Sequence, residues 1–382
     1  MVQERILVLG FRRELLRIIE DRGIPYVLWT EKRYKLKGCK PIDCIVSDFF
    51  DDSFKIQAIL NDREIERISH VIASTESSVV CAYFARRLLK TRVNSKALVE
   101  RCTDKLIMKK FLHEVGIPMT EFTAVKKNLD LKKVSKELDL PLVVKDRVNS
   151  GGRGTVISSN LEVIEKNLKE DRLIEKFVEA PEASVETFIH NRKILFTNVT
   201  EYFRKSGVNI IPASFAEAEL KSILELNEKV IEAMNIKWGV THLEIYRSKK
   251  GPLFGEIALR PPGGYIMDLI SMSYGFNAWE AFLDIETGIE PELNPEILSH
   301  SGVVIIHPGE GILEDIKGWD KVALNRCVVE TQLSVEVGGK IKNRDGVSAE
   351  IGHVLLTSSE YKDIVDAVNY IDKTVEFTVA AN

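Results

Sequence analysis

Residues 238–264 read WGVTHLEIYRSKKGPLFGEIALRPPGG, in which two alternating apolar and polar runs flank the short polar turn SKKG. Runs of this kind around a glycine-containing turn are typical of an antiparallel β-hairpin. If the turn is centred near Lys250, Glu244 lies directly opposite Glu256. Two glutamates would then face each other across a pair of strands.

The two faces of this hairpin differ in chemistry, because side chains alternate along a strand. Opposed carboxylates repel each other unless positive charge lies between them. Magnesium suits such a pair, since it often takes one or two carboxylates and completes its shell with water and phosphate oxygens. The alternative is a solvated face on which the glutamates pair with Arg247, Lys249 or Lys250. The predicted apolar face holds Leu243, Ile245, Ile257 and Leu259, and the predicted polar face holds His242, Glu244, Glu256 and Arg260.

A second stretch, PLVVKDRVNSGGRG at residues 141–154, places Lys145 at the end of a β-branched run and three glycines in the turn that follows. Glycines allow backbone amides to approach an anion, and lysine adds positive charge. The order excludes a Walker A loop, in which the lysine follows the glycines and opens a helix. The stretch therefore predicts either a phosphate-binding loop or an ordinary hairpin turn.

Residues 172–188, RLIEKFVEAPEASVETF, interleave acidic and apolar residues on two short predicted strands. Backbone C=O and N–H groups from Glu175 to Val178 could pair with adenine, and Glu182 could accept hydrogen bonds from ribose hydroxyls. A solvated acidic surface is the alternative for this segment.

The N-terminal region alternates predicted strands and helices, beginning with ERILVLGF at residues 4–11, which indicates a parallel sheet. Phe-Arg-Arg follows Gly10 where a dinucleotide-binding loop needs more glycines, so we exclude NAD binding there. Glu76 lies just past a predicted strand, where open α/β sheets hold ligands. It is equally suited to capping the next helix.

Composition limits the class of protein. The 382 residues are 45% hydrophobic and 29% charged with a net charge of −4, which predicts a multidomain globular protein without general affinity for nucleic acid or membranes. The start lacks a signal-peptide pattern, and the five cysteines are scattered, so we expect a cytoplasmic protein with free thiols. Cys39 and Cys44 lack a second Cys/His pair at zinc-finger spacing.

Taken in order, five stretches resemble the ATP-grasp superfamily over almost the whole chain. They are TDKLIMKKFLHEVGIP, LVVKDRVNSGGRG, LIEKFVEAPEASVE, HLEIY and FGEIALRPPGG. The resemblance implies an α/β and α+β multidomain protein with the ATP-grasp fold. It implies an N-terminal parallel α/β domain at 1–94, an ATP-grasp domain at 95–300 with a nucleotide-binding lid near 120–185, and a small β-rich C-terminal domain at 301–382. Glycine spacing and strand pattern after residue 301 resemble the L-amino-acid ligase branch more loosely.

The resemblance also assigns roles to residues. Lys105 and Lys145 would contact nucleotide phosphates, and Arg260 would stabilise the acyl phosphate and the tetrahedral intermediate, with Lys145 also counted as catalytic. The remaining assignments are the closing loop at Ser150, Gly151, Gly152 and Gly154, the adenine edge at Glu175, Lys176, Phe177 and Val178, the ribose contact at Glu182, the magnesium ligands Glu244 and Glu256, and substrate contacts at Glu76, His242, Gly263 and Gly264.

The implied activity is an ATP- and Mg²⁺-dependent ligation of a carboxylate to an amine, with an amino acid among the substrates and Mn²⁺ as a second candidate metal. Many family members carry an asparagine where this chain has Ala258. Either one magnesium is held more loosely, with water or His242 completing its shell, or a second metal binds weakly. The alternatives are a carboxylase or formyl-phosphate enzyme, and a non-catalytic ATP-binding module. The implied partners are small molecules and a second copy of the chain. His307 is expected to be structural.

Overall fold

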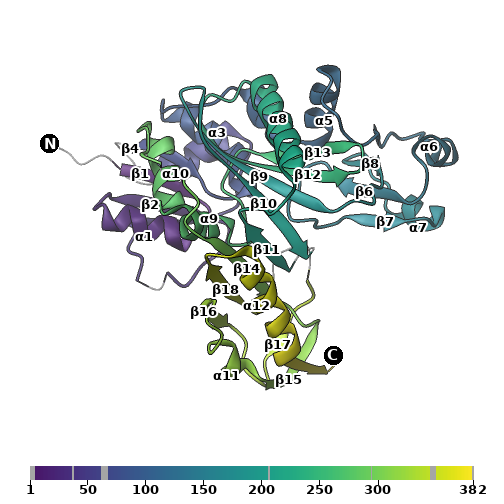
Figure 1. Cartoon of the computed structure of the whole chain (residues 1–382). Coiled ribbons are helices and arrows are strands. Elements are labelled where there is room, and N and C mark those ends of the chain that lie inside the picture. The colour runs from purple at the N-terminus through teal and green to yellow at the C-terminus, as the bar shows by residue number, and fades with distance from the viewer. Residues whose placement is uncertain are drawn as a thin grey trace.

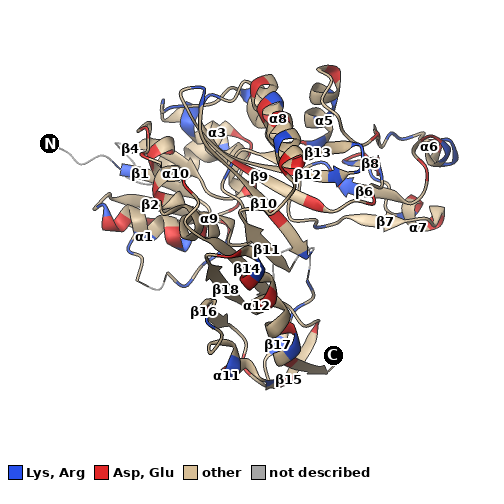
Figure 2. Ribbon diagram, viewed as in Figure 1, with Lys and Arg blue, Asp and Glu red and all other residues tan. Residues whose placement is uncertain are grey.

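The computed structural model describes residues 5–36, 38–61, 68–204, 207–293, 295–344 and 350–380. It contains four sheets and the helices that cover them (Figure 1). Figure 2 shows basic and acidic residues interspersed along the ribbon, in line with the near-balanced composition. None of the helices within the described ranges is long and apolar enough to span a bilayer.

The N-terminal sheet has four parallel strands in the order β3-β2-β1-β4, which confirms the predicted parallel sheet. Its central strand β1 is buried on both faces, as expected when helices cover a parallel sheet. The elements are β1 (Arg5–Leu9), α1 (Arg13–Asp21), β2 (Tyr26–Thr30), β3 (Asp43–Val46), α2 (Ser53–Asn61), β4 (Ile68–Ala73), the 3-10 helix η1 (Glu76–Ser78) and α3 (Val79–Leu88).

A small antiparallel sheet follows, with the strand order β5-β8-β6-β7. Before it, the Asp104 carboxylate accepts hydrogen bonds from the Leu106 and Ile107 amides and caps α5, so Lys105 opens that helix. The elements are α4 (Lys96–Thr103), α5 (Lys105–Glu114), β5 (Phe122–Ala124), α6 (Leu131–Leu138), β6 (Leu142–Asp146), β7 (Val156–Ser158), α7 (Leu161–Lys166) and β8 (Arg172–Lys176).

An eight-stranded sheet in the order β13-β12-β9-β10-β11-β14-β18-β16 forms the centre of the molecule. α8 packs against one face through an apolar cluster, and α9 and α10 cover part of the other face through a second cluster. The elements up to residue 287 are β9 (Glu182–His190), β10 (Lys193–Arg204), β11 (Val208–Ile211), α8 (Glu217–Met234), β12 (Gly239–Ser248), β13 (Gly251–Ala258), α9 (Ile266–Tyr274) and α10 (Ala278–Thr287).

The C-terminal region is not separated from the central sheet as the expected block of short strands implied. β14 pairs with β11, so the sheet runs continuously across residue 300, and only β15, β17 and β19 form a sheet of their own. Residues 345–349 of the predicted tail lie outside the described residues. The elements are β14 (His300–Ile306), β15 (Gly311–Lys317), α11 (Trp319–Val322), β16 (Val328–Leu333), β17 (Lys340–Ile341), β18 (Gly352–Ser358), α12 (Tyr361–Thr374) and β19 (Glu376–Ala380).

The predicted hairpin is formed by β12 and β13, and it places Glu244 opposite Glu256. The predicted register is wrong nearer the turn, because Ile245 pairs with Phe254 and the register shifts by one residue between these two pairs. The bulge falls at Gly255 and brings the glutamates back into opposition. A Cβ added to Gly255 would lie 2.9 Å from the Glu244 carbonyl oxygen, so the close approach of the strands requires glycine.

Gly255→Val should therefore destabilise the hairpin by about 1–3 kcal/mol, because the new side chain overpacks against backbone that cannot move aside. The measurement is the midpoint of urea denaturation. Gly263→Ala is the matched control, since a Cβ at Gly263 meets nothing within 4 Å. Equal midpoints for both variants would contradict the steric explanation.

Candidate active site

The two opposed glutamates share an electrostatic environment on one face of the central sheet. Their side chains are 45% exposed at Glu244 and 22% exposed at Glu256. Burial raises the pKa of Glu256, and the negative charge of Glu244 raises it further, although Lys105 acts in the opposite direction. Burial would also raise the pKa of Glu244, but a hydrogen bond from His242 together with nearby positive charges lowers it to about 2. A cation placed between the carboxylates would favour the ionised form of Glu256, whose pKa is raised.

The donor set fits magnesium held together with phosphate. Among the described residues no group of three or more His, Cys, Asp or Glu side chains could hold a metal ion on its own. Two carboxylate oxygen donors are sufficient for magnesium when water and a nucleotide complete the shell. Ala258, where many family members have asparagine, is buried opposite His242 and offers no side-chain ligand.

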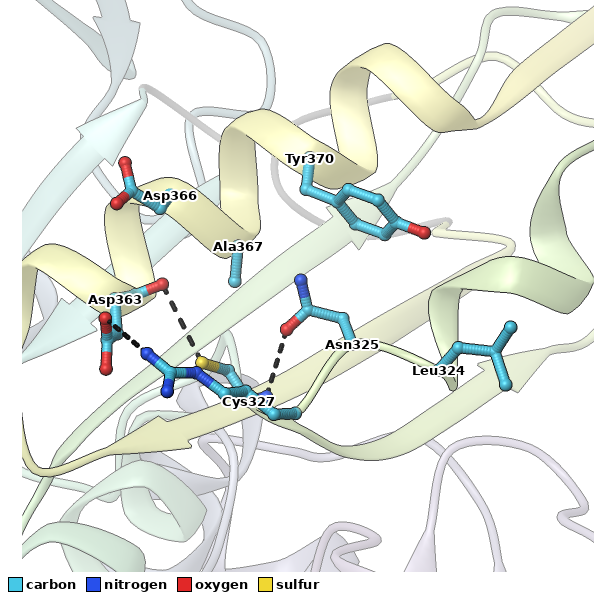
Figure 3. Close-up of a pocket in the computed structure, with 8 residues that line it drawn as sticks. Leu324, Asn325, Cys327, Asp363, Asp366, Ala367 and Tyr370 are labelled. Carbon is cyan, nitrogen blue, oxygen red and sulfur yellow. Dashed lines mark hydrogen bonds and ion pairs between the residues drawn. The ribbon is translucent and has the colours of Figure 1, made fainter.

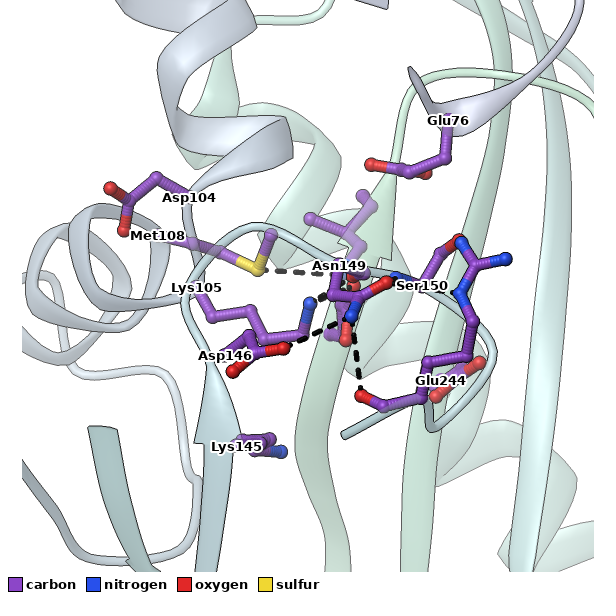
Figure 4. Close-up of polar contacts among 12 residues, drawn as sticks. Glu76, Asp104, Lys105, Met108, Lys145, Asp146, Asn149, Ser150 and Glu244 are labelled. Atoms are coloured by element: carbon purple, nitrogen blue, oxygen red, sulfur yellow. Dashed lines mark hydrogen bonds and ion pairs between the residues drawn. The ribbon is translucent and has the colours of Figure 1, made fainter. Parts of the chain in front are cut away.

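Two lysines border the carboxylate pair (Figure 4). Lys105 Nζ lies 3.1 Å from Glu256 Oε1 and donates a hydrogen bond to the Asn149 carbonyl oxygen. Lys145 Nζ lies 2.8 Å from Glu175 Oε2. Both lysines were predicted from the sequence, and they bring positive charge from α5 and β6 toward the same space.

Lys109 was not predicted and completes a buried ion cluster. Its Nζ lies 3.3 Å from Glu175 Oε1, so Glu175 binds two lysines while only 1% of its side chain is exposed. Burial would raise the pKa of Glu175, but Lys109 and Lys145 outweigh it and hold that pKa low. The cluster joins one carboxylate to two lysines, although burial lowers the pKa of Lys109. Lys109 is four residues after Lys105 on α5, and this helical spacing was the signal available in the sequence.

The glycine loop at residues 150–154 is closed on itself by side-chain contacts. Asn149 Oδ1 accepts hydrogen bonds from the Ser150 amide at 2.9 Å and from Arg153 Nε at 3.1 Å. Gly151, Gly152 and Gly154 all have positive φ, between 66° and 74°, which L side chains rarely adopt. Ser150 lies beside Lys105 and Asn149 in Figure 4.

The structure reduces the number of residues whose backbone groups could pair with adenine. The Lys176 amide donates to the Glu121 carbonyl oxygen at 3.0 Å, and the Lys176 carbonyl oxygen accepts from Thr120 Oγ1 at 2.8 Å. Its side chain lies 2.6 Å from Asp139. The backbone of Phe177 and Val178 is therefore the better candidate for adenine. Glu182 begins β9, in a different sheet from β8.

His242 is part of a buried network that the sequence did not reveal. Its Nδ1 lies 2.9 Å from Glu186 Oε1, and its Nε2 lies 3.5 Å from Glu244 Oε1. Burial would lower the pKa of His242, but the two carboxylates raise it to about 9. His242 thus bridges Glu186 and Glu244 and holds Glu244 in place. That His242 contributes to the metal shell stays a prediction.

Glu186 at the centre of this network is fully buried and fully bonded. Its two oxygens accept hydrogen bonds from Ser184 Oγ, Asn198 Nδ2 and Thr200 Oγ1 at 2.6–2.8 Å, in addition to the His242 contact. Glu182, Ser184 and Glu186 alternate along β9, and this period of two was the only signal for the network in the sequence.

Arg260 links the hairpin to the N-terminal sheet. Its Nε donates to Glu76 Oε2 at 2.8 Å, and its Nη1 donates to the Pro261 carbonyl oxygen at 3.0 Å. Glu76 opens η1 just beyond β4, at the sheet edge where it was predicted, while Thr75 provides the helix cap. Gly264 follows with a φ of +61°, and its carbonyl oxygen accepts from Asn209 Nδ2 at 3.1 Å.

Gly263 offers open space, since an added Cβ there meets nothing within 4 Å. His307 Nε2 contacts the Lys342 carbonyl oxygen at 3.1 Å in the C-terminal region. This contact agrees with the structural role expected for His307.

A separate surface pocket of about 300 Å³ lies between α12 and the turn before β16 (Figure 3). Arg326 Nη2 lies 2.9 Å from Asp363 Oδ1, and Cys327 Sγ contacts the Asp363 carbonyl oxygen. These polar groups are directed at each other, so we place no reaction in this pocket.

Comparisons with known proteins agree with this geometry. Residues 110–273 match the family model of the ATP-grasp domain. The L-arginine-specific L-amino acid ligase of Bacillus subtilis is 26% identical over 354 residues, covering 86% of this chain and 85% of the relative. The formate-dependent phosphoribosylglycinamide formyltransferase of Wolinella succinogenes is 23% identical over 55% of this chain and 56% of its own length.

Solved structures share the fold. An L-amino acid ligase from Bacillus licheniformis superimposes with a TM-score of 0.84 at 18% identity, covering 100% of both chains. An N5-carboxyaminoimidazole ribonucleotide synthetase from Thermotoga maritima gives a TM-score of 0.77 at 21% identity, covering 99% of this chain and 100% of the other. The architecture expected from the motifs, an ATP-grasp fold with an N-terminal parallel sheet, is confirmed.

The buried ion cluster predicts a difference between two substitutions. Glu175→Gln leaves Lys109 and Lys145 buried without a counter-charge, so it should lower the free energy of unfolding by about 3–5 kcal/mol. Lys109→Met leaves the ion pair between Glu175 and Lys145 intact and should cost about 1 kcal/mol or less. Urea denaturation of both variants measures the difference. A loss for Lys109→Met as large as that for Glu175→Gln would show that Lys109 is the main partner of the carboxylate.

Proposed function

We propose, from the premise that this chain is an ATP-grasp protein, that it is an ATP-dependent ligase which joins a carboxylate to an amine. The observation that carries the proposal is the opposition of Glu244 and Glu256 across β12 and β13, bordered by Lys105. Repelling carboxylates bordered by lysines are suited to a divalent cation that carries nucleotide phosphates. The products are an amide, ADP and phosphate.

The nucleotide is held by residues from several helices, strands and loops. Lys105 and Lys145 offset the charge of the phosphates, and the backbone amides of residues 150–154 close over them. The Phe177 and Val178 backbone binds adenine, and Glu182 accepts from the ribose hydroxyls. Closure of the glycine loop excludes water that would otherwise hydrolyse a reactive intermediate.

Glu244 and Glu256 would hold magnesium, which neutralises charge on the β- and γ-phosphates when it is bound. His242 keeps Glu244 ionised and oriented through its contact with Glu186. Manganese prefers the same oxygen donors and is the second candidate.

The reaction has two steps. A substrate carboxylate oxygen attacks the γ-phosphorus, the bond to the bridging oxygen breaks, and ADP leaves. The amine nitrogen then attacks the acyl carbonyl, phosphate leaves, and the nitrogen loses one proton. Arg260 faces the oxyanion that forms in the second step, and Glu76 holds its guanidinium in position.

An amino acid is the favoured substrate class. The support is the similarity of sequence to an L-amino acid ligase over 86% of this chain. A cytoplasmic location and a homodimer belong to the same proposal. The test is to screen pairs of amino acids for ATP-dependent phosphate release and to weigh the products by mass spectrometry.

The second candidate is a carboxylase or formyl-phosphate enzyme, which is favoured by the similarity to a formate-dependent formyltransferase. Phosphate release that depends on formate or bicarbonate, with no response to amino acids, would select it. A non-catalytic ATP-binding module is the third reading, and ADP release stimulated by a substrate would exclude it.

Glu256→Gln should reduce phosphate release by about a hundredfold or more, because it removes one of two ionised ligands for the divalent cation. Circular dichroism should show an unchanged fold. Glu228→Gln on the exposed face of α8 is the matched control and should leave the rate unchanged. Normal phosphate release by Glu256→Gln would overturn the metal assignment.

Arg260→Ala should lower product formation by about 10²- to 10³-fold while changing the dissociation constant for ADP little, since its guanidinium stabilises the acyl-transfer step. Steady-state rates and calorimetric titration with ADP separate the two quantities. Equal losses in product formation and nucleotide affinity would contradict the proposed role.

A further inference from the structure

Arg12 lies immediately before α1 and has no acidic partner. Its Nε donates to the Ser74 carbonyl oxygen at 3.2 Å, and within the described ranges no carboxylate lies within ion-pair distance of its guanidinium. Burial and the positive charge of Arg260 lower the pKa of Arg12 to about 10, although the negative charges of Glu14 and Asp268 act in the opposite direction. Two guanidinium groups therefore lie near each other, and Arg12 lacks an anion of its own.

One turn anchors both arginines. Arg12 binds Ser74, and Arg260 binds Glu76 two residues later, in each case through Nε. Glu76 balances Arg260, whereas the terminal nitrogens of Arg12 donate to no group in the part of the chain that the structure describes. The guanidinium of Arg12 is therefore held through Nε, while its two terminal nitrogens point to no acceptor among the described protein residues. Such a guanidinium has the geometry that binds a carboxylate.

Asp268 is the complementary feature on the neighbouring helix. It lies in the first turn of α9, and its Oδ1 accepts from Trp279 Nε1 at 3.2 Å. No Lys, Arg or His of the described residues forms an ion pair with it. Burial and the negative charge of Glu14 raise the pKa of Asp268 to about 6, and Arg12 acts in the opposite direction.

The two helices that carry these groups are joined through α10, which packs against both. α1 and α9 contribute to one apolar cluster, which includes Leu15 and Leu16 from α1 and Ile266 and Met267 from α9. Arg12 and Asp268 lie at the first turns of these helices and act on each other electrostatically without forming an ion pair. An unpaired cation and an unpaired anion held close to each other are complementary to a zwitterion.

We propose that Arg12 binds the carboxylate, and Asp268 the ammonium group, of the amino acid that supplies the amine. This inference rests on the proposed ligase function. Arg12 is anchored on Ser74, next to η1, whereas Glu244 and Glu256 lie on the hairpin beside Lys105. The Arg12 site therefore differs from the place where a carboxylate would be activated beside the nucleotide. The bound ammonium loses one proton before its nitrogen attacks, so the Asp268 contact belongs to the binding step.

The experiment is calorimetric titration of the whole protein, saturated with Mg²⁺ and ADP, with each of the twenty common L-amino acids. The amino acid that binds most tightly is then compared with its carboxamide and with its N-acetyl derivative. We expect each derivative to bind about ten- to a hundredfold more weakly than the amino acid, because each lacks one charge-assisted contact.

Two variants assign these losses to residues. Arg12→Gln should weaken binding of the amino acid about ten- to a hundredfold and bind the carboxamide as the unaltered protein does. Asp268→Asn keeps an acceptor for Trp279 and should weaken binding of the amino acid but not of its N-acetyl derivative. Arg17→Gln, on the exposed side of α1, is the matched control.

Each result decides the inference. Three results would overturn the Arg12 site. In the first, the protein binds no amino acid, and in the second it binds the amino acid and its carboxamide with equal affinity. In the third, Arg12→Gln weakens binding of both ligands equally. If Arg12→Gln does not fold, Arg12→Lys should retain part of the preference for the free carboxylate, and an unchanged preference would count against the fork. If an amino acid binds in a way that depends on Arg12, but no pair of amino acids causes phosphate release, the ligase function is rejected and the Arg12 site is retained.

Discussion

Repulsion between Glu244 and Glu256 is the constraint around which the site is arranged. The central sheet sets these carboxylates directly opposite each other, where like charges destabilise a strand pair. The surrounding residues moderate this repulsion from two sides. Lys105 contacts Glu256, and His242 contacts Glu244, so each carboxylate has its own positive neighbour. The arrangement remains open to a doubly charged ion that brings an anionic ligand.

Buried charge around the pair is balanced by networks rather than by single ion pairs. Glu175 joins Lys109 and Lys145 beneath the site, while Glu186 anchors His242 beside it. Removing the carboxylate that such a network shares leaves its partners buried and unpaired, which costs about 3–5 kcal/mol in typical cases. This requirement for complete pairing makes the site rigid where phosphates would bind. The loop at residues 150–154 differs from the rest of the site, because three of its residues adopt positive φ angles that favour glycine.

An ion pair joins the N-terminal sheet to the central sheet beside the site. Arg260, which follows the hairpin, binds Glu76, which follows β4. Elsewhere Arg86 forms a buried ion pair with Glu286 at 2.6 Å, which links α3 to α10. Substrate contacts proposed from both sheets therefore depend on one packed interface. A substitution that loosened this interface would affect the substrate side of the site more than the nucleotide side.

The sequence by itself determined the parallel N-terminal sheet, the hairpin and the lysines at 105 and 145, because local periodicity and turn chemistry act over neighbouring residues. The sequence also located the two glutamates. The predicted pairing nearer the turn was off by one residue, and the bulge at Gly255, which was not predicted, corrected this offset at the glutamates. Only the tertiary structure placed Glu186, Lys109 and Arg12 in the surroundings of the candidate site. It alone also showed that β14 continues the central sheet. The physical reason is that burial and charge pairing depend on which strands and helices meet, and segments far apart in the chain carry no local pattern that specifies their partner.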